Sequence, residues 1–397
     1  MNKNVPKLRF KDNNGIDYPV WETQRFYEII LKAKLGGNYE NSGELTENPL
    51  IKMGNLGRGR MIMDKIEYIT KGSQVEETDL LNEGDLLFNT RNTLDLVGKV
   101  AIWRSELKKA YYNSNLLRLE FRKNKVANNS FMNYIFNSHN VLAQLKAIAI
   151  GTTSVAAIYT RDLNNIKFSL PCLEEQAKIA NFLSNVDNII EEQEGKVKDL
   201  EQYKKGMMQK IFKQEVRFKD DNGIDYSAWE EKKLGEITDI GTGSNDLQDK
   251  DNNGLYPFFV RSKNIERINQ YTFDGEAILI PGDGNIGQIY HYINGKFAYH
   301  QRVYKISDFK KGVLGKYIYF YMSKFFLKEA LKNSVKATVD SLRLPTLTGM
   351  LIKLPCLEEQ RKIANFLSNI DNIIEEEKNK LEDLKLWKKG LLQQMFV

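Results

Sequence analysis

The chain has 397 residues, of which 42% are apolar and 28% charged, and its formal net charge is +6 at pH 7. This length allows two or three packed domains, and the apolar content excludes a disordered chain. The most apolar window, "AIAIGTTSVAAIY", is shorter than the roughly 20 residues that a bilayer span needs, and no secretion signal opens the sequence, so we expect a cytoplasmic protein with no membrane partner.

The cysteines and histidines limit the possible chemistry. Cys172 and Cys356 occupy the same place in two repeated segments, and we expect both to be reduced, buried side chains, as isolated cysteines usually are inside cells. The three histidines form no HxxxH spacing and the cysteines form no CxxC. The sequence therefore offers no recognisable metal site, and we expect no cofactor.

The first predicted element is a short segment that returns later in the chain. "LRFKDNNGIDYPVWE" at residues 8–22 matches "VRFKDDNGIDYSAWE" at residues 216–230 in 11 of 15 positions. A second repeat is closer, because 20 of the 22 residues that begin at Pro171 return from Pro355. A period of roughly 200 residues is far longer than a solenoid repeat, so each unit is the size of a domain and residues 1–22 open the first unit.

Residues 23–170 are predicted to form a first variable α/β domain. Short apolar runs such as "EGDLLFNTRN", "LVGKVAIW" and "NLLRLEF" alternate with turn signals, as strands do, and "FMNYIFNSHNVLAQLKAIA" has a helical pattern. Arginine suits bidentate contact with guanine, asparagine and glutamine suit adenine, and lysine suits phosphates. The candidates for such contacts in this domain are Lys52, Asn55, Arg58, Arg60, Asn89, Arg91 and Asn92.

Residues 171–214 are predicted to form one long amphipathic helix. Pro171 is compatible with a helix start, and apolar residues recur at spacings of three, four and seven, close to a heptad pattern. About 40 residues at ~1.5 Å each give a rod on the order of 60 Å. The residues expected in its packing seam are Ile179, Phe182, Val186, Ile189, Val197 and Leu200.

Residues 215–354 contain the second copy of the repeat segment and a second variable domain. "YPFFVRSKNI" and "FAYHQRVYKI" have strand and loop patterns and "KYIYFYMSKFFLKEALK" has a helical one, so we expect the two variable domains to share an architecture. "GDGNIG" has the dinucleotide-binding spacing GxGxxG, but a strand-like "QIYHYI" follows it, which favours a glycine-rich turn close to DNA or to another backbone. The candidates for DNA contacts here are Arg261, Ser262, Lys263, Asn264, Asn285, His300, Gln301 and Arg302.

Residues 355–397 are predicted to form a second helix like the first. The residues expected in its seam are Ile363, Phe366, Ile370, Ile373, Leu381 and Leu384. Gln193 and Glu377 interrupt the two seams at the same place, which indicates register control or a stutter in the heptad pattern, or equally a turn exposed to water. Since neither rod can stand alone in water, we expect the two to pack antiparallel. The predicted fold class is α+β, with two α/β domains separated by a coiled-coil spacer of two long antiparallel helices and an internal pseudo-twofold repeat.

The positive charge lies in the variable domains. Residues 23–170 carry 20 lysines and arginines against 15 acidic residues, and residues 231–354 carry 18 against 13. The two helical segments are almost neutral, each with 7 basic and 8 acidic residues. Two basic modules joined by neutral connectors favour a polyanionic partner, while ordinary solvated lysine explains the charge alone equally well.

The order of the parts resembles that of the specificity subunits of type I restriction-modification enzymes. The resemblance covers the whole chain and rests on "SLPCLEEQ" and "KLPCLEEQ", on the run "FFVRSKNI…FDGEAILIPGDGNIGQ…HQRVY", and on the duplicated order of variable domain and helix. It implies a non-catalytic DNA-binding subunit whose two target recognition domains each read one half of a split, asymmetric site in double-stranded DNA. It also implies that the helices set the spacer of the site and dock two modification subunits, which are adenine methyltransferases and which restriction subunits join in turn.

One stretch departs from a strict repeat. "GTTSV" precedes the first helix, whereas "VKATVD", without a glycine, precedes the second, so Thr152, Thr153, Thr338 and Asp340 are candidates for positions near DNA and no more. The residues also leave two other classes of function open. One is a coiled-coil scaffold whose basic domains bind proteins, which a weak salt dependence of DNA binding would favour. The other is a nucleotide-dependent enzyme that uses "GDGNIG", which binding of labelled NAD or ATP would reveal.

Overall fold

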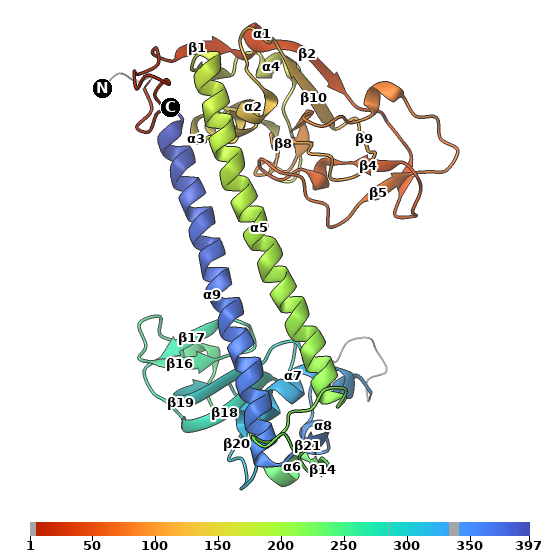
Figure 1. Cartoon of the computed structure of the whole chain (residues 1–397), viewed down its shortest axis with the longest axis vertical. Helices are drawn as coiled ribbons and strands as arrows, with labels where there is room; N and C mark the ends of the chain where they lie inside the picture. Colours follow the sequence, from red (N-terminus) through yellow and green to blue (C-terminus); the bar gives the residue numbers. More distant parts are fainter. Residues whose placement is uncertain (1–4, 285, 333–340) are drawn as a thin grey trace. The chain divides into compact units, whose positions relative to one another are not determined.

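The computed structural model of the chain describes residues 5–284, 286–332 and 341–397 (Figure 1). The chain divides into two compact units, Met1–Glu194 with Lys380–Val397, and Gly195–Asn379. The two long helices, α5 (Leu173–Phe212) and α9 (Leu357–Met395), each contribute one stretch to either unit. Both begin and end within two residues of the predicted bounds. No helix among the described residues combines the length and apolarity that crossing a bilayer requires.

The variable domain of the first unit is framed by an antiparallel ribbon, in which β1 (Glu22–Arg25) pairs with β13 (Lys167–Leu170). Between these strands lie sheets of order β2-β10-β6-β8, β3-β5-β4-β9 and β11-β12-β7. Their strands are β2 (Ile30–Leu35), β3 (Asn41–Ser42), β4 (Pro49–Ile51), β5 (Glu67–Ile69), β6 (Leu86–Asn89), β7 (Arg91–Asn92), β8 (Val100–Ile102), β9 (Tyr111–Tyr112), β10 (Leu116–Phe121), β11 (Ile150–Gly151) and β12 (Ala156–Ala157). The short helices α1 (Phe26–Ile29) and α4 (Thr160–Leu163) stand next to the ribbon strands in sequence.

The single helix predicted near residues 131–149 is in fact two, α2 (Asn129–Phe136) and α3 (His139–Ile148). The break falls at Asn137, whose side-chain amide donates to the carbonyls of Val100 and Asn133 at 3.2 and 2.8 Å. This competing hydrogen bond to a neighbouring strand ends the first helix, as asparagine side chains often do.

The second unit has the same frame around one continuous six-stranded sheet. β14 (Glu230–Lys233) pairs antiparallel with β21 (Leu351–Leu354), and α6 (Leu234–Ile237) follows β14 as α1 follows β1. Its six strands have the order β15-β20-β18-β19-β16-β17, and α7 (Gly315–Lys332) packs on the sheet through buried Tyr317, Phe320 and Phe326. The strands are β15 (Asp239–Thr242), β16 (Tyr256–Phe259), β17 (Ile265–Ile268), β18 (Phe273–Pro281), β19 (His291–Tyr299) and β20 (Val303–Ser307), and α8 (Leu344–Thr348) precedes β21. The order β15-β20-β18-β19 repeats the order β2-β10-β6-β8. Strand β16 pairs antiparallel with β17 and parallel with β19, as β4 does with β5 and β9. The expected shared architecture is therefore confirmed for the frame and for this strand pairing, and the second unit joins in one sheet what the first divides between two.

The helix seams follow a strict alternation of four- and three-residue steps, which corrects two predicted positions. Ile189 and Ile373 are 47% and 45% exposed, whereas their neighbours Ile190 and Ile374 are only 6% and 7% exposed. Leu183 and Leu367 are fully buried as well, and Phe182 and Phe366 lie at the edge of the seam. The remaining predicted seam residues, Ile179, Val186, Val197, Leu200, Ile363, Ile370, Leu381 and Leu384, are buried or half-buried.

Glu377 is a polar member of the seam rather than part of a water-exposed turn. It is 6% exposed, and its carboxylate lies 3.0 Å from Lys196 Nζ within the second unit. Burial rules out the water-exposed turn for Glu377, and since a charged residue at a seam position can fix the register of paired helices, register control stays the prediction for it. The cysteines, by contrast, were predicted to be buried, and this is wrong: Cys172 is exposed and Cys356 half-buried, because both precede the first helical turn outside the seam.

The repeated "LEEQ" starts both long helices and ties each one to its frame. Glu175 is fully buried and accepts from Arg9 Nη2 at 2.6 Å and Trp21 Nε1 at 3.1 Å. Gln176 donates to the Lys125 carbonyl at 3.0 Å and accepts from the Ala127 amide at 2.9 Å. One glutamate thus holds the repeat segment, and the next residue holds the variable domain.

The second copy makes the same contacts with different residues. Glu359 is fully buried and accepts from Arg217 Nη2 at 2.7 Å and Trp229 Nε1 at 2.9 Å. Gln360 donates to the Gly312 carbonyl at 2.9 Å and accepts from the Leu314 amide at 2.9 Å. These contacts give a structural reason for the near-identity of the two copies, because the helix, the repeat segment and the domain edge meet at the same four-residue motif.

Candidate DNA interface

The first variable domain brings four of its predicted site residues together on one small sheet. Arg91 and Asn92 form β7, which pairs antiparallel with β12. The loop between β11 and β12 carries Thr152 and Thr153, and the Thr153 carbonyl accepts from the Leu94 amide at 3.2 Å. Arg91, Thr152 and Thr153 are exposed and Asn92 is half-buried. A basic side chain and two hydroxyls therefore share a surface, although they lie about 60 residues apart in sequence.

Glycine is required where this hairpin turns. Gly151 has a φ of +143°, and a Cβ at this position would lie 2.2 Å from the Val155 carbonyl oxygen. The Thr152 amide donates to that same oxygen at 2.8 Å. Only glycine permits this close approach, which explains why "GTTSV" has a glycine, and the turn it makes presents both threonines to solvent.

Three other predicted residues of this domain stabilise loops. Lys52 Nζ lies 2.7 Å from Glu67 Oε2, and the side-chain amide of Asn55 donates to the carbonyls of Ile62 and Lys65 at 3.0 and 2.9 Å. Asn89 is fully buried, and its Oδ1 accepts from the Arg91 amide at 3.1 Å. The buried amides of Asn55 and Asn89 position the exposed chain around them and are not themselves at the surface.

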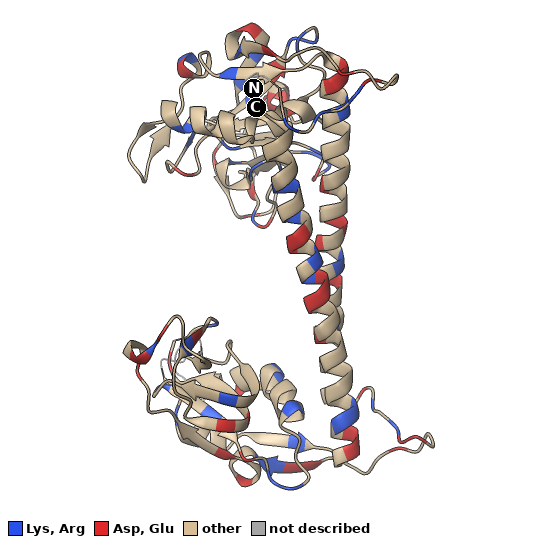
Figure 2. Ribbon diagram, turned by 90° about the vertical axis from the view of Figure 1, so that its left-hand side faces the viewer, with Lys and Arg blue, Asp and Glu red and all other residues tan. Residues whose placement is uncertain are grey.

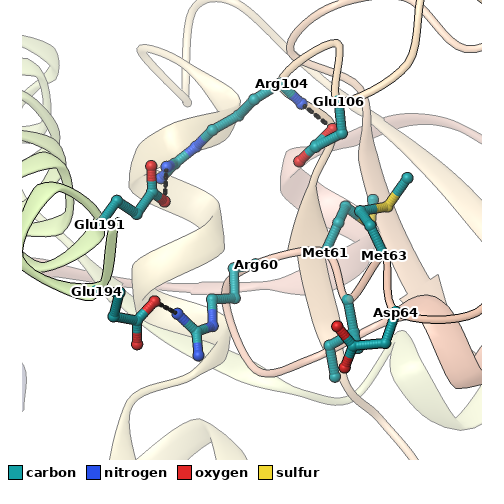
Figure 3. Close-up of a pocket in the computed structure, with 9 residues that line it drawn as sticks. Arg60, Met61, Met63, Asp64, Arg104, Glu106, Glu191 and Glu194 are labelled. Atoms are coloured by element: carbon teal, nitrogen blue, oxygen red, sulfur yellow. Dashed lines mark hydrogen bonds and ion pairs between the residues drawn. The ribbon is translucent and has the colours of Figure 1, made fainter. Parts of the chain in front are cut away.

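Arg60 points to helix α5 and lines a cavity of about 500 Å³ between this domain and that helix (Figure 3). Its Nη1 lies 2.8 Å from Glu194 Oε2, and Arg104 Nη1 lies 2.8 Å from Glu191 Oε1. Burial would raise the pKa of Glu194, but hydrogen bonds from Arg60 and Lys385 outweigh this effect and hold it below its usual range. We assign this cavity to the junction of domain and helix. Arg58, also a predicted contact, donates to the Asp95 carbonyl at 3.1 Å.

In the second variable domain, the two predicted arginines lie beside one carboxylate. Arg261 Nη1 and Arg302 Nη1 lie 3.2 and 3.0 Å from Asp283 Oδ2. Partial burial would raise the pKa of Asp283, but the hydrogen bonds and charges of Arg302 and Arg261 hold it below its usual range. Asp283 thus keeps both guanidinium groups in place, each still about half exposed or more. Asp283 was not among the predicted site residues, and its only signal in the sequence is an acid between two glycines in "GDGNIG".

His300 and Gln301 belong to the same end of the sheet. His300 is 4% exposed, its Nδ1 accepts from the Arg302 amide at 2.9 Å, and its Nε2 lies 3.4 Å from Asp246 Oδ1. Gln301 donates to Asp246 Oδ2 at 3.0 Å and is exposed. Ser262, Lys263 and Asn264 are exposed in the loop that starts at Arg261, whereas Asn285, Thr338 and Asp340 lie outside the described residues.

Two of the three glycines of "GDGNIG", Gly282 and Gly287, allow close packing. Gly287 has a φ of +71°, and a Cβ there would lie 2.9 Å from the Leu327 Cα of α7. The Gly282 amide donates to the Arg302 carbonyl at 2.8 Å. Strand β19 follows the motif, as predicted, where dinucleotide binding requires a helix. Gly282 and Gly287 therefore approach other backbones, one of the two roles expected for this turn, and Asp283 lies between Gly282 and Gly284 beside the two arginines.

Known proteins share both the sequence pattern and the order of parts of this chain. Residues 2–202 and 226–386 match the family model described as "Type I restriction modification DNA specificity domain". The chain is 26% identical to the putative type I restriction enzyme MjaX specificity subunit of Methanocaldococcus jannaschii, over 94% of this chain and 92% of that protein. It is 27% identical to the MjaVIII specificity subunit of the same organism, over 96% and 94% of the two chains.

Solved structures share the fold. The crystal structure of a type I restriction-modification S subunit from M. genitalium covers 99% of both chains with a TM-score of 0.66 at 16% sequence identity. A structure described as showing complex assembly and conformational transition of the type I R-M system covers 95% of this chain and 97% of its own, with a TM-score of 0.53 at 18% identity.

Proposed function

Since this chain belongs to the type I restriction-modification DNA specificity family and is the specificity subunit of such a system, we propose how its residues divide that task. The first target recognition domain spans residues 23–170 and the second lies within residues 215–354. Each reads one half of a split, asymmetric site in double-stranded DNA. The helical segments at 171–214 and 355–397 set the unread spacer. The chain selects the site, and partner subunits perform methyl transfer and cleavage.

Exposed, hydrogen-bonding side chains on each domain support this assignment. In the first domain the DNA-facing surface is the β7-β12-β11 sheet with Arg91, Thr152 and Thr153. In the second it is the end of the sheet with Arg261 and Arg302. Arginine can read guanine through two hydrogen bonds, and hydroxyls and lysines suit phosphates. Lys52, Asn55, Arg60, Asn89 and His300 act in this proposal by holding the loops that carry those groups.

Asp283 keeps Arg261 and Arg302 in an extended, paired arrangement before DNA arrives. An arginine held by one carboxylate oxygen retains free N–H groups for a base edge or phosphate. Pre-positioned side chains lose less rotamer entropy on binding, which favours affinity for the correct half-site. The negative charge of Asp283 also opposes non-specific attraction to the phosphate backbone.

We further propose that the two repeats dock two copies of a methyltransferase subunit. Two identical partners need two equivalent patches, and exposed apolar side chains that match between copies are candidates for such patches. Four pairs of equivalent residues have this property: Leu8 and Val216, Ile16 and Ile224, Ile189 and Ile373, and Tyr203 and Trp387.

Replacing Ile189 and Ile373 together by glutamate is expected to weaken binding to the modification subunit by about tenfold or more, because each change puts a charge into an apolar contact. Co-purification and titration by light scattering measure the effect. A matched variant with glutamate at Leu45 and Leu255, exposed apolar residues of the two variable domains, should bind as the unaltered chain does. Equal binding by both variants would place the docking patches elsewhere.

The proposed function as a whole is tested by sequencing the methylome of a host that expresses this chain with its modification subunits. The expected result is a new split motif with methylated adenine on both strands, absent when the chain is omitted. Binding of the complex to random duplexes should also weaken steeply with salt, since each phosphate contact releases counterions. An assembled complex that leaves the methylome unchanged would refute the proposal.

A further inference from the structure

The two long helices are near copies up to residues 192 and 376, and beyond them several equivalent positions differ in charge. Two of these differences replace glutamate by lysine, and the others are Gln193/Glu377, Lys198/Glu382, Lys210/Gln394 and Lys213/Val397. Glu194 of the first copy corresponds to Lys378 of the second, and Glu201 corresponds to Lys385. Lysine thus replaces glutamate at both places. Charged residues of both signs lie along α5 and α9 (Figure 2).

These four residues pair with one another. In the first unit Glu194 Oε1 lies 3.1 Å from Lys385 Nζ, and in the second unit Glu201 Oε1 lies 2.6 Å from Lys378 Nζ. The two ion pairs occupy equivalent places in the repeat. In each of them the acid belongs to α5 and the base to α9, so the charge pattern of one helix complements that of the other.

The other ion pairs between the helices do not distinguish the copies. Asp187 pairs with Lys388 in the first unit, and the equivalent Asp371 pairs with Lys204 in the second. Because the residues are the same in both copies, these contacts would form whichever two helices met. Two separate chains have two Lys196–Glu377 pairs, and pairing α5 with α5 would break both. Pairing α9 with α9 would replace them by two Lys380–Glu377 contacts, because Lys380 is the equivalent of Lys196.

The consequence appears when like helices are placed in the same antiparallel register. Two α5 helices would bring Glu194 of each against Glu201 of the other, and two α9 helices would bring Lys378 against Lys385. Exchange of helices between two chains would therefore turn four attractive contacts into four repulsive ones. From this geometry we infer that Glu194, Glu201, Lys378 and Lys385 make each long helix pair with its unlike copy rather than with the like helix of a second chain.

This selectivity is needed because the repeats are so alike. The buried seam residues offer almost the same apolar surface in both copies. They include Ile179, Leu183 and Val186 in the first copy and Ile363, Leu367 and Ile370 in the second. Apolar contact alone would favour like and unlike pairing almost equally, so charge has to decide between them. Neither DNA recognition nor the docking of partner subunits enters into this selectivity.

The test is the double variant Glu201→Lys with Lys378→Glu in the full chain. It keeps both native ion pairs, with one reversed in direction, but it makes like pairing attractive as well. Each α5 helix then carries one acid and one base at the facing positions 194 and 201, and each α9 helix does so at positions 378 and 385. After unfolding and refolding over a range of concentrations, sedimentation should show a dimer-to-monomer ratio at least about tenfold above that of the unaltered chain, since four exposed contacts change sign.

The control is Glu201→Asp with Lys378→Arg, which keeps the sign of every contact and should stay monomeric. The inference is overturned if the double variant forms no more dimer than this control. It is also overturned if the unaltered chain itself refolds mainly to a dimer. If the double variant does not refold, the single variant Lys378→Glu carries the same test, because it also removes the difference between like and unlike pairing. A monomeric result for it would count against the inference equally.

Discussion

Replacing Arg261 and Arg302 together by alanine is expected to make one half of the methylated site degenerate and to leave the other half unchanged. The two guanidinium groups flank Asp283 at 3.2 and 3.0 Å and are exposed on the second variable domain. A bidentate arginine contributes about 1–3 kcal/mol of discrimination between bases, so losing two should lower the preference for that half-site by roughly 100-fold or more. Methylome sequencing of a host carrying the variant reads out both halves at once.

The matched control replaces Lys310 and Lys311 by alanine, which removes the same charge from exposed positions of the same domain. This variant should weaken binding to all duplexes slightly and keep the motif intact. If the control relaxes the motif as far as the arginine variant does, the arginines act through net charge alone. If the arginine variant keeps the full sequence preference at both half-sites, the surface that contacts the bases lies in another part of the domain.

Replacing Glu359 by alanine is expected to destabilise the second unit by about 3 kcal/mol. The carboxylate is fully buried and satisfies both Arg217 and Trp229, so its removal leaves a partly buried positive charge and an indole N–H without an acceptor. For a unit of this size the corresponding fall in melting temperature is about 6–12 °C. Calorimetry of the full chain measures it as an earlier transition of one unit.

The neighbouring residue provides the control. Glu358 is more exposed in the same helical turn, and its replacement by alanine should change the stability by less than about 0.5 kcal/mol. The equivalent pair in the first unit, Glu175→Ala and Glu174→Ala, should repeat the contrast there. Equal melting temperatures for Glu359→Ala and Glu358→Ala would mean that the repeat segment is not held by this carboxylate.

Local patterns predicted the long helices well because their information is local. Proline, two acids and an apolar stripe located α5 and α9 to within two residues. The same pattern predicted Ile189 and Ile373 as seam residues, which is wrong. Adjacent isoleucines fit a loose spacing of three, four or seven equally well. Only the partner helix decides between them, and it buries Ile190 and Ile374.

The candidate interface was less predictable because it depends on contacts between distant residues. Arg60 was proposed for DNA, but its partner Glu194 lies on a helix 134 positions away. Asn55 is buried by its own loop, and Asn89 lies in the middle of a sheet. Conversely, Asp283 escaped notice because nothing in the sequence around it shows that Arg261 and Arg302 converge there. Residue type indicated which side chains could contact bases, and tertiary structure decided which are exposed.

The division of the chain into units has a consequence for synthesis. The second unit is continuous in sequence, Gly195–Asn379, whereas the first needs both its opening residues and Lys380–Val397. On a ribosome the first unit begins earlier but must wait for the intervening 185 residues, on the order of 10–40 s at usual elongation rates. During that time the seam residues Ile179, Leu183 and Val186 have no α9 to cover them. A nascent chain of this protein is therefore expected to expose an apolar helix face to chaperones until its second domain has been made.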